Sequence, residues 1–482
     1  MFRRVLVANR GEIACRILGA LRGLGVPSVA VYHVTDRHAP HTALALADER
    51  VELHHAIPVS AYLDAAQLLA ACAATGADAL HPGYGFLSES AGFAEACARA
   101  GVVFVGPSPE AMRLVGDKLS ARALAARVGA PVSPIATIDD DGASAAALGF
   151  PLLVKASAGG GGKGMRIVRG PGELAAQVAL ARSEAQRYFG DPRIYAEPLV
   201  ERPRHLEVQI LGDGRGGAIA LGTRDCSVQR RHQKLIEEAP ALRVPPGLVD
   251  TALAIAREAR YGNAGTVEFI VAPDGRYQFL EVNARLQVEH PVTELVTGCD
   301  LVAAQLAIAA GGALPDPAAA SIASGHAIEC RICAEEPERD FRPATGRIGV
   351  LRLPAGDGVR VDSGVAEGQE VTAAYDSLLL KLVVHGGSRP QALERMQRAL
   401  ADLVVLGVAT NADYLARMIA SEPFQRGDVH TQLVAEHPLP APAPAPALAA
   451  AVAIAAALAD PDTRRSAFAI PEPYASIGGF RN

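Results

Sequence analysis

The sequence lacks the features that point to nucleic acid, membranes or secretion. Its 46 Lys and Arg residues are outnumbered by 52 Asp and Glu residues, giving a formal net charge of -6. A face that binds nucleic acid is normally basic, so this balance argues against such a partner. The stretch closest to membrane composition, residues 447–459, is too short to span a bilayer. With no secretory leader before the first strand-like residues, we expect a soluble, cytoplasmic protein that contacts neither membrane nor nucleic acid.

The sequence also gives little indication of disulfides or of a zinc site. The seven cysteines are an odd number and are scattered along the chain, which is typical of reduced thiols in the cytosol. One CxxC motif, CRIC at residues 330–333, has no second pair to complete a zinc site. We therefore expect ordinary thiols there.

The chain is long enough for several domains. Its 482 residues predict roughly three. Residues 1–112 alternate apolar strands with amphipathic helices, which is typical of a parallel α/β sheet. Residues 113–323 predict a second α/β unit with a glycine-rich lid at about residues 130–200. Residues 324–437 carry short strands and turns, and a stiff Pro/Ala linker and tail follow at 438–482.

Four consecutive glycines lie between two lysines in KASAGGGGKGM, residues 155–165. Glycine lets backbone N–H groups approach an anion, and lysine adds a positive charge, so the stretch suits a phosphate. It is not a P-loop, because Ser157 and Gly164 stand where that motif requires glycine and Ser or Thr. The flanking runs PLLVKAS and MRIV are strand-like, which predicts a flap at the tip of a hairpin. A merely flexible loop remains the alternative.

A second hairpin is predicted where TVEFIVA and RYQFLEVN are joined by PDG. If the loop holds four residues, 273–276, Glu268 pairs with Glu281. Asn283 then shares a face with Glu281, because side chains alternate along a strand. Two carboxylates and an amide oxygen suit a magnesium ion that bridges nucleotide phosphates. A solvated acidic strand face is the alternative.

Arg285, Gln287 and Glu289 alternate in the residues that follow. If the chain stays extended, all three side chains point to one side. A guanidinium beside a carboxylate can orient a small oxyanion while the carboxylate accepts its proton. A structural ion pair is the alternative.

A basic cluster occupies residues 224–240 of this otherwise acidic protein. It could hold phosphate or bicarbonate, and it could equally be a solvated basic face. His205, in ERPRHLEVQI, carries the weakest signal by itself, because a lone histidine more often packs than functions. The cluster consists of Arg224, Arg230, Arg231, His232 and Lys234.

Taken together, these motifs resemble those of the biotin carboxylase component of biotin-dependent carboxylases, an ATP-grasp enzyme. The resemblance covers residues 2–437 and rests on GDKLSAR, KASAGGGGKGM, RHLEVQ, RDCSVQRRHQK, FLEVNARLQVEHPVTE and GHAIECRICAEEP, in the family's order. It implies an α/β, ATP-grasp fold with a Rossmann-like N-terminal parallel-sheet domain and a β-rich C-terminal domain.

The resemblance also implies roles for individual residues. ATP phosphates would be held by Lys118, Lys155, Gly161 and Gly162, with Glu197, Pro198, Leu199 and Val200 bordering the adenine. Met165, His205, Gln229 and His232 would surround the nucleotide. Glu268, Glu281 and Asn283 match the ligands of Mg²⁺ (or Mn²⁺). Lys234, Arg285, Gln287, Val288 and Glu289 match the bicarbonate pocket, and Arg331 matches the residue that stabilises the biotin enolate.

In the implied reaction, Glu289 acts as general base on bicarbonate, which attacks the γ-phosphoryl group of ATP. The resulting carboxyphosphate breaks down to carbon dioxide and phosphate; the phosphate takes the N1 proton of biotin, and carbon dioxide carboxylates that nitrogen. This is the first half-reaction of an acetyl-CoA or other acyl-CoA carboxylase. The alternatives are another ATP-grasp ligase and a non-catalytic ATP-binding subunit.

The partners follow from what is missing. No methionine is adjacent to a lysine, so the Met-Lys-Met biotin acceptor is absent and the carrier is expected on another chain. The implied partners are a biotin carboxyl carrier protein and a carboxyltransferase subunit; a homodimer is also implied. The final PYASIGGFRN resembles the start of the segment that leads toward the carrier in longer acyl-CoA carboxylase α-subunits, as in a truncated or split subunit.

Overall fold

The computed structural model describes residues 1–36, 42–138, 143–157, 165–316 and 323–440. Contacts group Met1–Pro438 into one compact unit, which contains every element named below.

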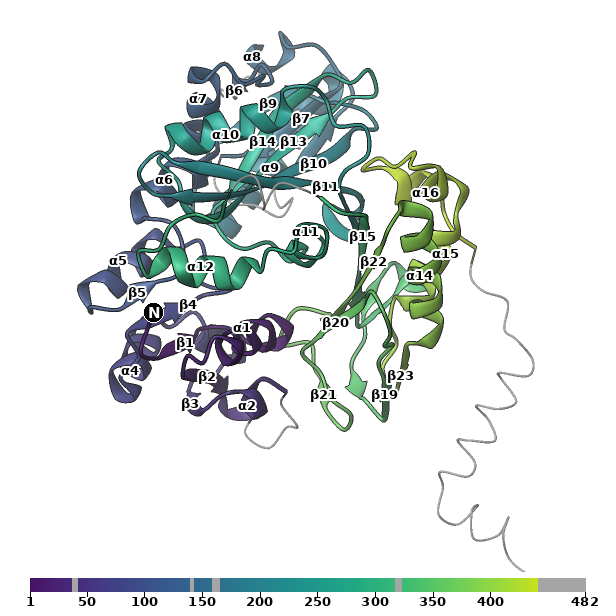
Figure 1. Cartoon of the computed structure of the whole chain (residues 1–482). Helices are drawn as coiled ribbons and strands as arrows, with labels where there is room; N and C mark the ends of the chain where they lie inside the picture. Colours follow the sequence, from purple (N-terminus) through teal and green to yellow (C-terminus); the bar gives the residue numbers. More distant parts are fainter. Residues whose placement is uncertain (37–41, 139–142, 158–164, 317–322, 441–482) are drawn as a thin grey trace, which may run out of the picture. The chain divides into compact units, whose positions relative to one another are not determined.

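The first sheet has five parallel strands in the order β3-β2-β1-β4-β5 (Figure 1). The central strand β1 reads VLV and is fully buried, as expected where helices cover both faces of a parallel sheet. This confirms the predicted parallel α/β sheet at the N-terminus. The strands are β1 (Val5–Val7), β2 (Ser28–His33), β3 (Glu49–Leu53), β4 (Ala79–His81) and β5 (Val103–Phe104).

Several helices between residues 11 and 127 begin at a side-chain cap. Asp64, Ser90, Ser108 and Asp117 each accept a hydrogen bond from the backbone N–H three residues on, which satisfies an otherwise unpaired donor. Asp117 thereby fixes the start of α7 at Lys118. The helices are α1 (Gly11–Gly23), η1 (Val34–Asp36), α2 (Thr42–Leu46), α3 (Pro58–Ala61), α4 (Ala65–Thr75), α5 (Ala91–Arg99), α6 (Pro109–Gly116) and α7 (Lys118–Arg127).

A smaller antiparallel sheet has the order β6-β9-β7-β8. Strands β7 and β8 pair from Leu152 opposite Val168, so the strands flanking the glycines form the predicted hairpin. Its tip, with Gly161 and Gly162, lies outside the described residues. The elements are β6 (Ala136–Thr137), α8 (Ala143–Ala146), β7 (Leu152–Ala156), β8 (Arg166–Val168), α9 (Pro171–Phe189) and β9 (Ile194–Pro198).

The central sheet is antiparallel, with the order β14-β13-β10-β11-β12-β15-β22-β20. It runs without interruption across residue 324, because β12 pairs with β15. Its elements and the helices beside them are β10 (Arg204–Asp213), β11 (Ala218–Arg230), β12 (Gln233–Ala239), α10 (Leu248–Glu258), β13 (Gly262–Val271), β14 (Tyr277–Asn283), α11 (His290–Thr297), α12 (Leu301–Ala309), β15 (His326–Cys333), β20 (Val359–Ser363) and β22 (Leu378–Gly386).

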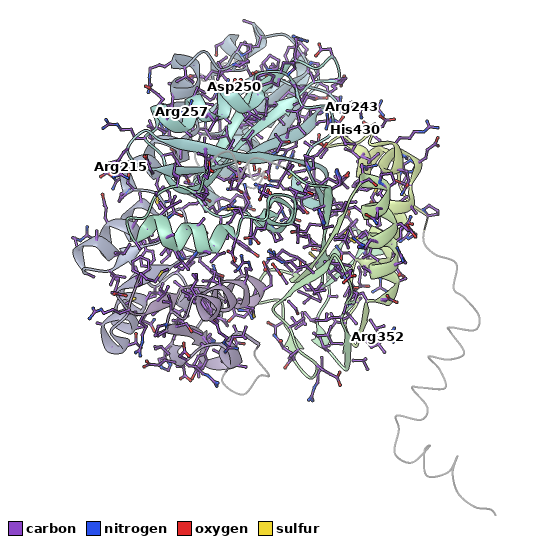
Figure 2. The ribbon with its side chains drawn as sticks, in the orientation of Figure 1. Arg215, Arg243, Asp250, Arg257, Arg352 and His430 are labelled. Carbon is purple, nitrogen blue, oxygen red and sulfur yellow. The ribbon has the colours of Figure 1, made fainter. Side chains whose placement is uncertain are left out.

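Short strands and helices complete the C-terminal part. Arg243, which lies between β12 and α10 and is labelled in Figure 2, donates to Asp428 Oδ1 of this part at 3.2 Å. They are β16 (Glu335–Glu336), η2 (Pro337–Arg339), β17 (Arg342–Pro343), β18 (Gly346–Arg347), β19 (Val350–Arg352), β21 (Glu370–Val371), α14 (Arg389–Asp402), β23 (Val404–Leu406), α15 (Ala412–Ala420), α16 (Glu422–Arg426) and α17 (Leu433–Glu436).

Within the described ranges, no single helix is long and apolar enough to cross a membrane; α11 and α12 together reach that length and composition but are bent by 95°.

The β13–β14 hairpin pairs Glu268 with Glu281, as predicted, but by a different route. Five residues, 272–276, separate the strands, so the assumed four-residue loop is wrong. Val271 stands opposite Tyr277, which alone would place Glu268 opposite Leu280. A bulge next to Phe269 shifts the register by one residue and restores the Glu268–Glu281 pair.

Candidate active site

Four neighbouring strands of the central sheet place charged side chains in one row. Glu281 of β14 stands opposite Glu268 of β13, and Glu268 stands opposite Glu207 of β10. Glu207 in turn stands opposite Arg224 of β11. Residues directly opposite each other in antiparallel strands share a face, so the row forms one charged strip.

Arg224 anchors this row from inside the protein. Its side chain and that of Glu207 are both fully buried, and its Nε donates to the Glu207 carboxylate. The guanidinium also donates to Gln209 Oε1 at 2.7 Å, Thr293 Oγ1 at 2.9 Å and Thr266 Oγ1 at 3.0 Å. A buried charge needs such a full set of partners. The guanidinium of Arg224 is therefore a buried structural group.

Lys234 of β12 lies among three carboxylates. Its Nζ is 2.6 Å from Glu207 Oε2, 3.0 Å from Glu268 Oε1 and 2.5 Å from Glu289 Oε1. Burial favours the neutral amine, but the surrounding carboxylates outweigh it and raise the pKa of Lys234 well above its ordinary value. Lys234 is thus a permanent cation that joins the strip to Glu289.

Glu289 is fully buried and is held by two cations. Besides Lys234, it accepts from Arg331 Nη2 at 2.9 Å. Burial would raise the pKa of Glu289, but Lys234 and Arg331 outweigh it and hold the pKa well below its ordinary value. Arg331 also donates from Nε to Glu237 Oε1 at 2.5 Å, and Glu237 is fully buried. The Glu289 carboxylate is therefore ionised at neutral pH and lies beside a fixed guanidinium.

The segment from Arg285 to Glu289 is bent, so the assumption of an extended chain is wrong: a bend falls at Arg285 and a turn at Val288 and Glu289, just before α11. The side chains nevertheless converge. Arg285 Nη1 donates to Gln287 Oε1 at 2.8 Å, and Gln287 Nε2 donates to Glu268 Oε1 at 3.0 Å. Gln287 therefore connects Arg285 to the charged strip.

The predicted metal ligands are held by cations in this structure. Glu268 contacts Lys234, Glu281 Oε2 lies 3.3 Å from Lys118 Nζ, and Asn283 Oδ1 accepts from Arg285 Nη2 at 3.0 Å. Burial would raise the pKa of Glu268, but Lys234 and His205 lower it below its ordinary value. Two carboxylates and an amide oxygen on one hairpin face are a donor set that suits Mg²⁺. The residues present therefore fit that ion.

Some of the residues predicted to bind the nucleotide adjoin the charged strip, and others lie elsewhere. His205 Nε2 lies 2.9 Å from Glu268 Oε2, and Gln229 Nε2 lies 3.3 Å from His205 Nδ1, so both adjoin the strip. Lys155 of β7 instead forms a buried ion pair with Glu197 of β9. Among the remaining residues, His232 is exposed, and Met165, Pro198, Leu199 and Val200 are partly buried.

The basic cluster divides into separate parts. Arg224 and Lys234 face the buried carboxylates, as described above. Arg230 and Arg231 both pair with Asp340 instead, Arg231 Nη2 at 2.7 Å from Oδ2. Neither a single anion site nor a uniformly solvated face describes this cluster, because register shifts in β11 lie between Arg224 and Arg230, and a turn separates Arg230 from Lys234.

Cys330 and Cys333 form no disulfide and are buried in β15, and the expectation that they bind no zinc stays a prediction. The residues that the sequence analysis missed are Glu207, Glu237 and Glu89. Glu89 Oε2 accepts from Arg285 Nε at 3.0 Å, from a loop almost 200 positions earlier in the chain. Only strand register, which places Glu207 beside Glu268, offered a signal for any of the three.

Three family models match the chain in succession. They are described as the biotin carboxylase N-terminal domain (residues 1–112), the ATP-binding domain of the carbamoyl-phosphate synthase L chain (117–316) and the biotin carboxylase C-terminal domain (329–436). A biotin carboxylase from Nostoc sp. is 44% identical over 444 residues, covering 90% of this chain and 99% of its own length. The chain belongs to the biotin carboxylase family of ATP-dependent ligases. The resemblance inferred from the motifs is thereby confirmed.

Relatives named as subunits of other carboxylases are almost equally similar. The pyruvate carboxylase of Methanothermobacter thermautotrophicus has a subunit that is 44% identical, covering 91% of this chain and 90% of its own length. The α subunit of rat mitochondrial methylcrotonoyl-CoA carboxylase is 43% identical over 90% of this chain, which spans only 62% of that relative.

Solved structures confirm the ATP-grasp biotin carboxylase fold. The Campylobacter jejuni biotin carboxylase, in a β,γ-ATP complex, has a TM-score of 0.88 at 40% identity, covering 91% of this chain and 99% of its own. The biotin carboxylase domain dimer of Hydrogenobacter thermophilus 2-oxoglutarate carboxylase, with MgADP and bicarbonate, has a TM-score of 0.87 at 41% identity, covering 91% and 98%.

Proposed function

We propose that this biotin carboxylase carboxylates biotin on a separate carrier protein, using ATP and bicarbonate, as the first half-reaction of an acetyl-CoA or other acyl-CoA carboxylase. The observation that carries the proposal is the contact of Glu289 with both Lys234 and Arg331, next to the Glu268–Glu281 pair. A base, two cations and a set of metal ligands are the parts that the reaction needs.

The chemistry explains why these parts belong together. Bicarbonate is a poor electrophile, so it has to be activated before the weakly nucleophilic urea nitrogen of biotin can attack it. Glu289 is the proposed base that takes the bicarbonate proton as bicarbonate attacks the γ-phosphoryl group. Lys234, Arg285, Gln287 and Val288 are the proposed residues that hold the anion, and Arg331 is the proposed donor to the biotin enolate oxygen.

The contacts of Glu289 have a consequence for bicarbonate binding. Lys234 and Arg331 hold Glu289 in an ionised, weakly basic state. Bicarbonate that accepts a hydrogen bond from Lys234 would loosen that hold, and the Glu289 carboxylate would become a stronger base. Binding of the anion and activation of its base are then linked through Lys234.

The proposed metal ligands are Glu268, Glu281 and Asn283, and the bound ion would neutralise phosphate charge. Lys118 and Lys155 are proposed to hold the ATP phosphates, together with Gly161 and Gly162 of the glycine-rich loop. The adenine is proposed to lie along Glu197–Val200, near Met165, His205, Gln229 and His232.

The finer assignments are also proposals. The resemblance of the C-terminal PYASIGGFRN to acyl-CoA carboxylase α-subunits supports an acyl-CoA acceptor, and the proposed partners are a carrier chain and a carboxyltransferase subunit. A homodimer is supported by the dimeric Hydrogenobacter domain. Cytoplasmic location stays a prediction, since relatives include a mitochondrial enzyme.

ADP release by the purified chain tests the function. With Mg-ATP, we expect release that depends on bicarbonate and rises with free biotin. Turnover indifferent to both would point to another ATP-grasp ligase, and tight ATP binding without turnover to a non-catalytic subunit. Supplying the carrier, the carboxyltransferase and either acetyl-CoA, propionyl-CoA or pyruvate then identifies the acceptor, with pyruvate as the result that contradicts the acyl-CoA proposal.

A further inference from the structure

A buried lysine outside the predicted site holds the backbone of residues 285–289, the segment that carries Arg285, Gln287 and Glu289. Lys381 of β22 is fully buried, and its Nζ donates to the backbone carbonyl of Val288 at 2.9 Å. That carbonyl belongs to the peptide unit that joins Val288 to Glu289. Because a peptide unit is planar, holding its oxygen also fixes the direction of the Glu289 N–H and the positions of both Cα atoms.

Lys381 is itself held from two further elements. Its Nζ lies 3.1 Å from Glu12 Oε2 at the start of α1 and 3.7 Å from Asp362 Oδ2 of β20. In the sheet, Lys381 stands opposite Arg331 on one side and Asp362 on the other. Arg331 thus reaches the Glu289 side chain while the adjacent Lys381 reaches the backbone just before it.

Close packing fixes where Glu12 stands. A Cβ on Gly364 would lie 2.3 Å from the backbone nitrogen of Glu12, so only glycine lets the end of β20 approach the first turn of α1 this closely. The N-terminal domain is thereby connected to the catalytic segment through one short path: Gly364 against Glu12, Glu12 to Lys381, and Lys381 to Val288.

Burying an ammonium group is unfavourable unless carboxylates and hydrogen bonds compensate, as they do here. We propose that Lys381 is a positioning residue for the reaction, which orients Val288 and Glu289 toward bicarbonate and is itself oriented by Glu12 and Asp362. The inference rests on the proposed role of Val288 and Glu289 in bicarbonate binding. It adds a role for α1, which supplies no residue to the site itself.

The test compares Lys381→Met with a matched control, Arg389→Met. Arg389 is also a largely buried cation that pairs with a carboxylate, Glu238, and donates to backbone carbonyls, those of Phe424 and Gln425. Both variants lose a buried cation. Only Lys381→Met should raise the KM for bicarbonate and lower kcat, each by about tenfold or more, with the KM for ATP unchanged.

Two further measurements keep the outcome clear. Hydrogen exchange of residues 285–292 should become faster in Lys381→Met and not in Arg389→Met, a readout that needs no turnover. If Lys381→Met does not fold, Glu12→Gln should still raise the bicarbonate KM severalfold, because it weakens the hold on Lys381.

A folded Lys381→Met or Glu12→Gln variant with a wild-type bicarbonate KM and wild-type exchange of residues 285–292 would overturn the positioning role. A wild-type chain without bicarbonate-dependent ADP release would instead contradict the proposed function, and the exchange comparison would still decide the role of Lys381.

Discussion

Arg331 Nη2 lies 2.9 Å from Glu289 Oε2, so the proposed enolate donor and the proposed base are in direct contact. Both groups are also fixed from the other side, Arg331 by Glu237 and Glu289 by Lys234. The positive charge of the proposed enolate donor and the negative charge of the proposed base therefore neutralise each other.

Replacing the base should abolish catalysis without preventing nucleotide binding. Glu289→Gln keeps the size of the side chain and its contact with Arg331 but cannot accept the bicarbonate proton. We expect bicarbonate-dependent ADP release to fall by about 100-fold or more, with ATP affinity within a few-fold of wild type. Steady-state kinetics and nucleotide titration measure the two quantities. Activity close to that of wild type would remove Glu289 from the role of base.

Replacing a proposed metal ligand should change the magnesium requirement. Glu281 is partly exposed and contacts Lys118, so Glu281→Gln should fold normally. We expect the Mg²⁺ concentration for half-maximal ADP release to rise by about tenfold or more. Glu258→Gln is the control, because Glu258 is an exposed carboxylate paired with Arg127 at the end of α10. Equal magnesium curves for the two variants would contradict the metal assignment.

Stability should depend strongly on Arg224. Arg224→Met leaves the fully buried Glu207 without its main counter-charge, and we expect the free energy of unfolding to fall by about 3–5 kcal/mol. Arg426→Met is the control, since Arg426 and Glu422 form an exposed pair on α16, and a change below about 0.5 kcal/mol is expected. Denaturant unfolding compares the two. Similar losses in both would mean that the charged strip does not stabilise the sheet.

Acid should destabilise the protein through His81. Burial lowers the pKa of His81 from 6.5 to about 3, so the folded protein keeps this imidazole neutral while the unfolded chain protonates it. Protonation of His81 in the unfolded chain costs the folded protein nothing above pH 6.5, but it lowers the free energy of unfolding progressively as the pH falls from 6.5 toward 3. Relative to His81→Asn, wild type should lose about 2 kcal/mol of unfolding free energy between about pH 7.5 and about pH 5.

His81→Asn retains an acceptor for the Gly83 N–H, which donates to His81 Nδ1 at 3.0 Å. The comparison therefore isolates the titration. Parallel stability curves for the two proteins across this pH range would show that His81 does not titrate as its burial requires.

The sequence allowed local geometry to be predicted where strand alternation and turn residues decide it. The Glu268–Glu281 pair and the strands of the glycine hairpin are examples. The bulge next to Phe269 could not be predicted, because a five-residue loop with a bulge and a four-residue loop without one give the same pairing. Motif resemblance, not pattern, identified the family.

Contacts between distant segments were beyond prediction. Glu89 reaches Arg285, and Lys381 reaches Val288, from elements whose placement depends on how the sheets and helices pack. Each residue by itself is an ordinary charged side chain. Likewise, the sequence alone suggests that the adjacent Arg230 and Arg231 could bind an anion, whereas in the structure both pair with Asp340.

The most direct test of the central claim is detection of the product. The purified chain is incubated with Mg-ATP, ¹³C-bicarbonate and free biotin, and the mixture is examined by NMR at alkaline pH, where carboxybiotin persists. We predict a labelled carboxybiotin signal that is present with wild type and absent with Glu289→Gln. Stoichiometric ADP release by wild type without labelled carboxybiotin would contradict the claim that this site carboxylates biotin.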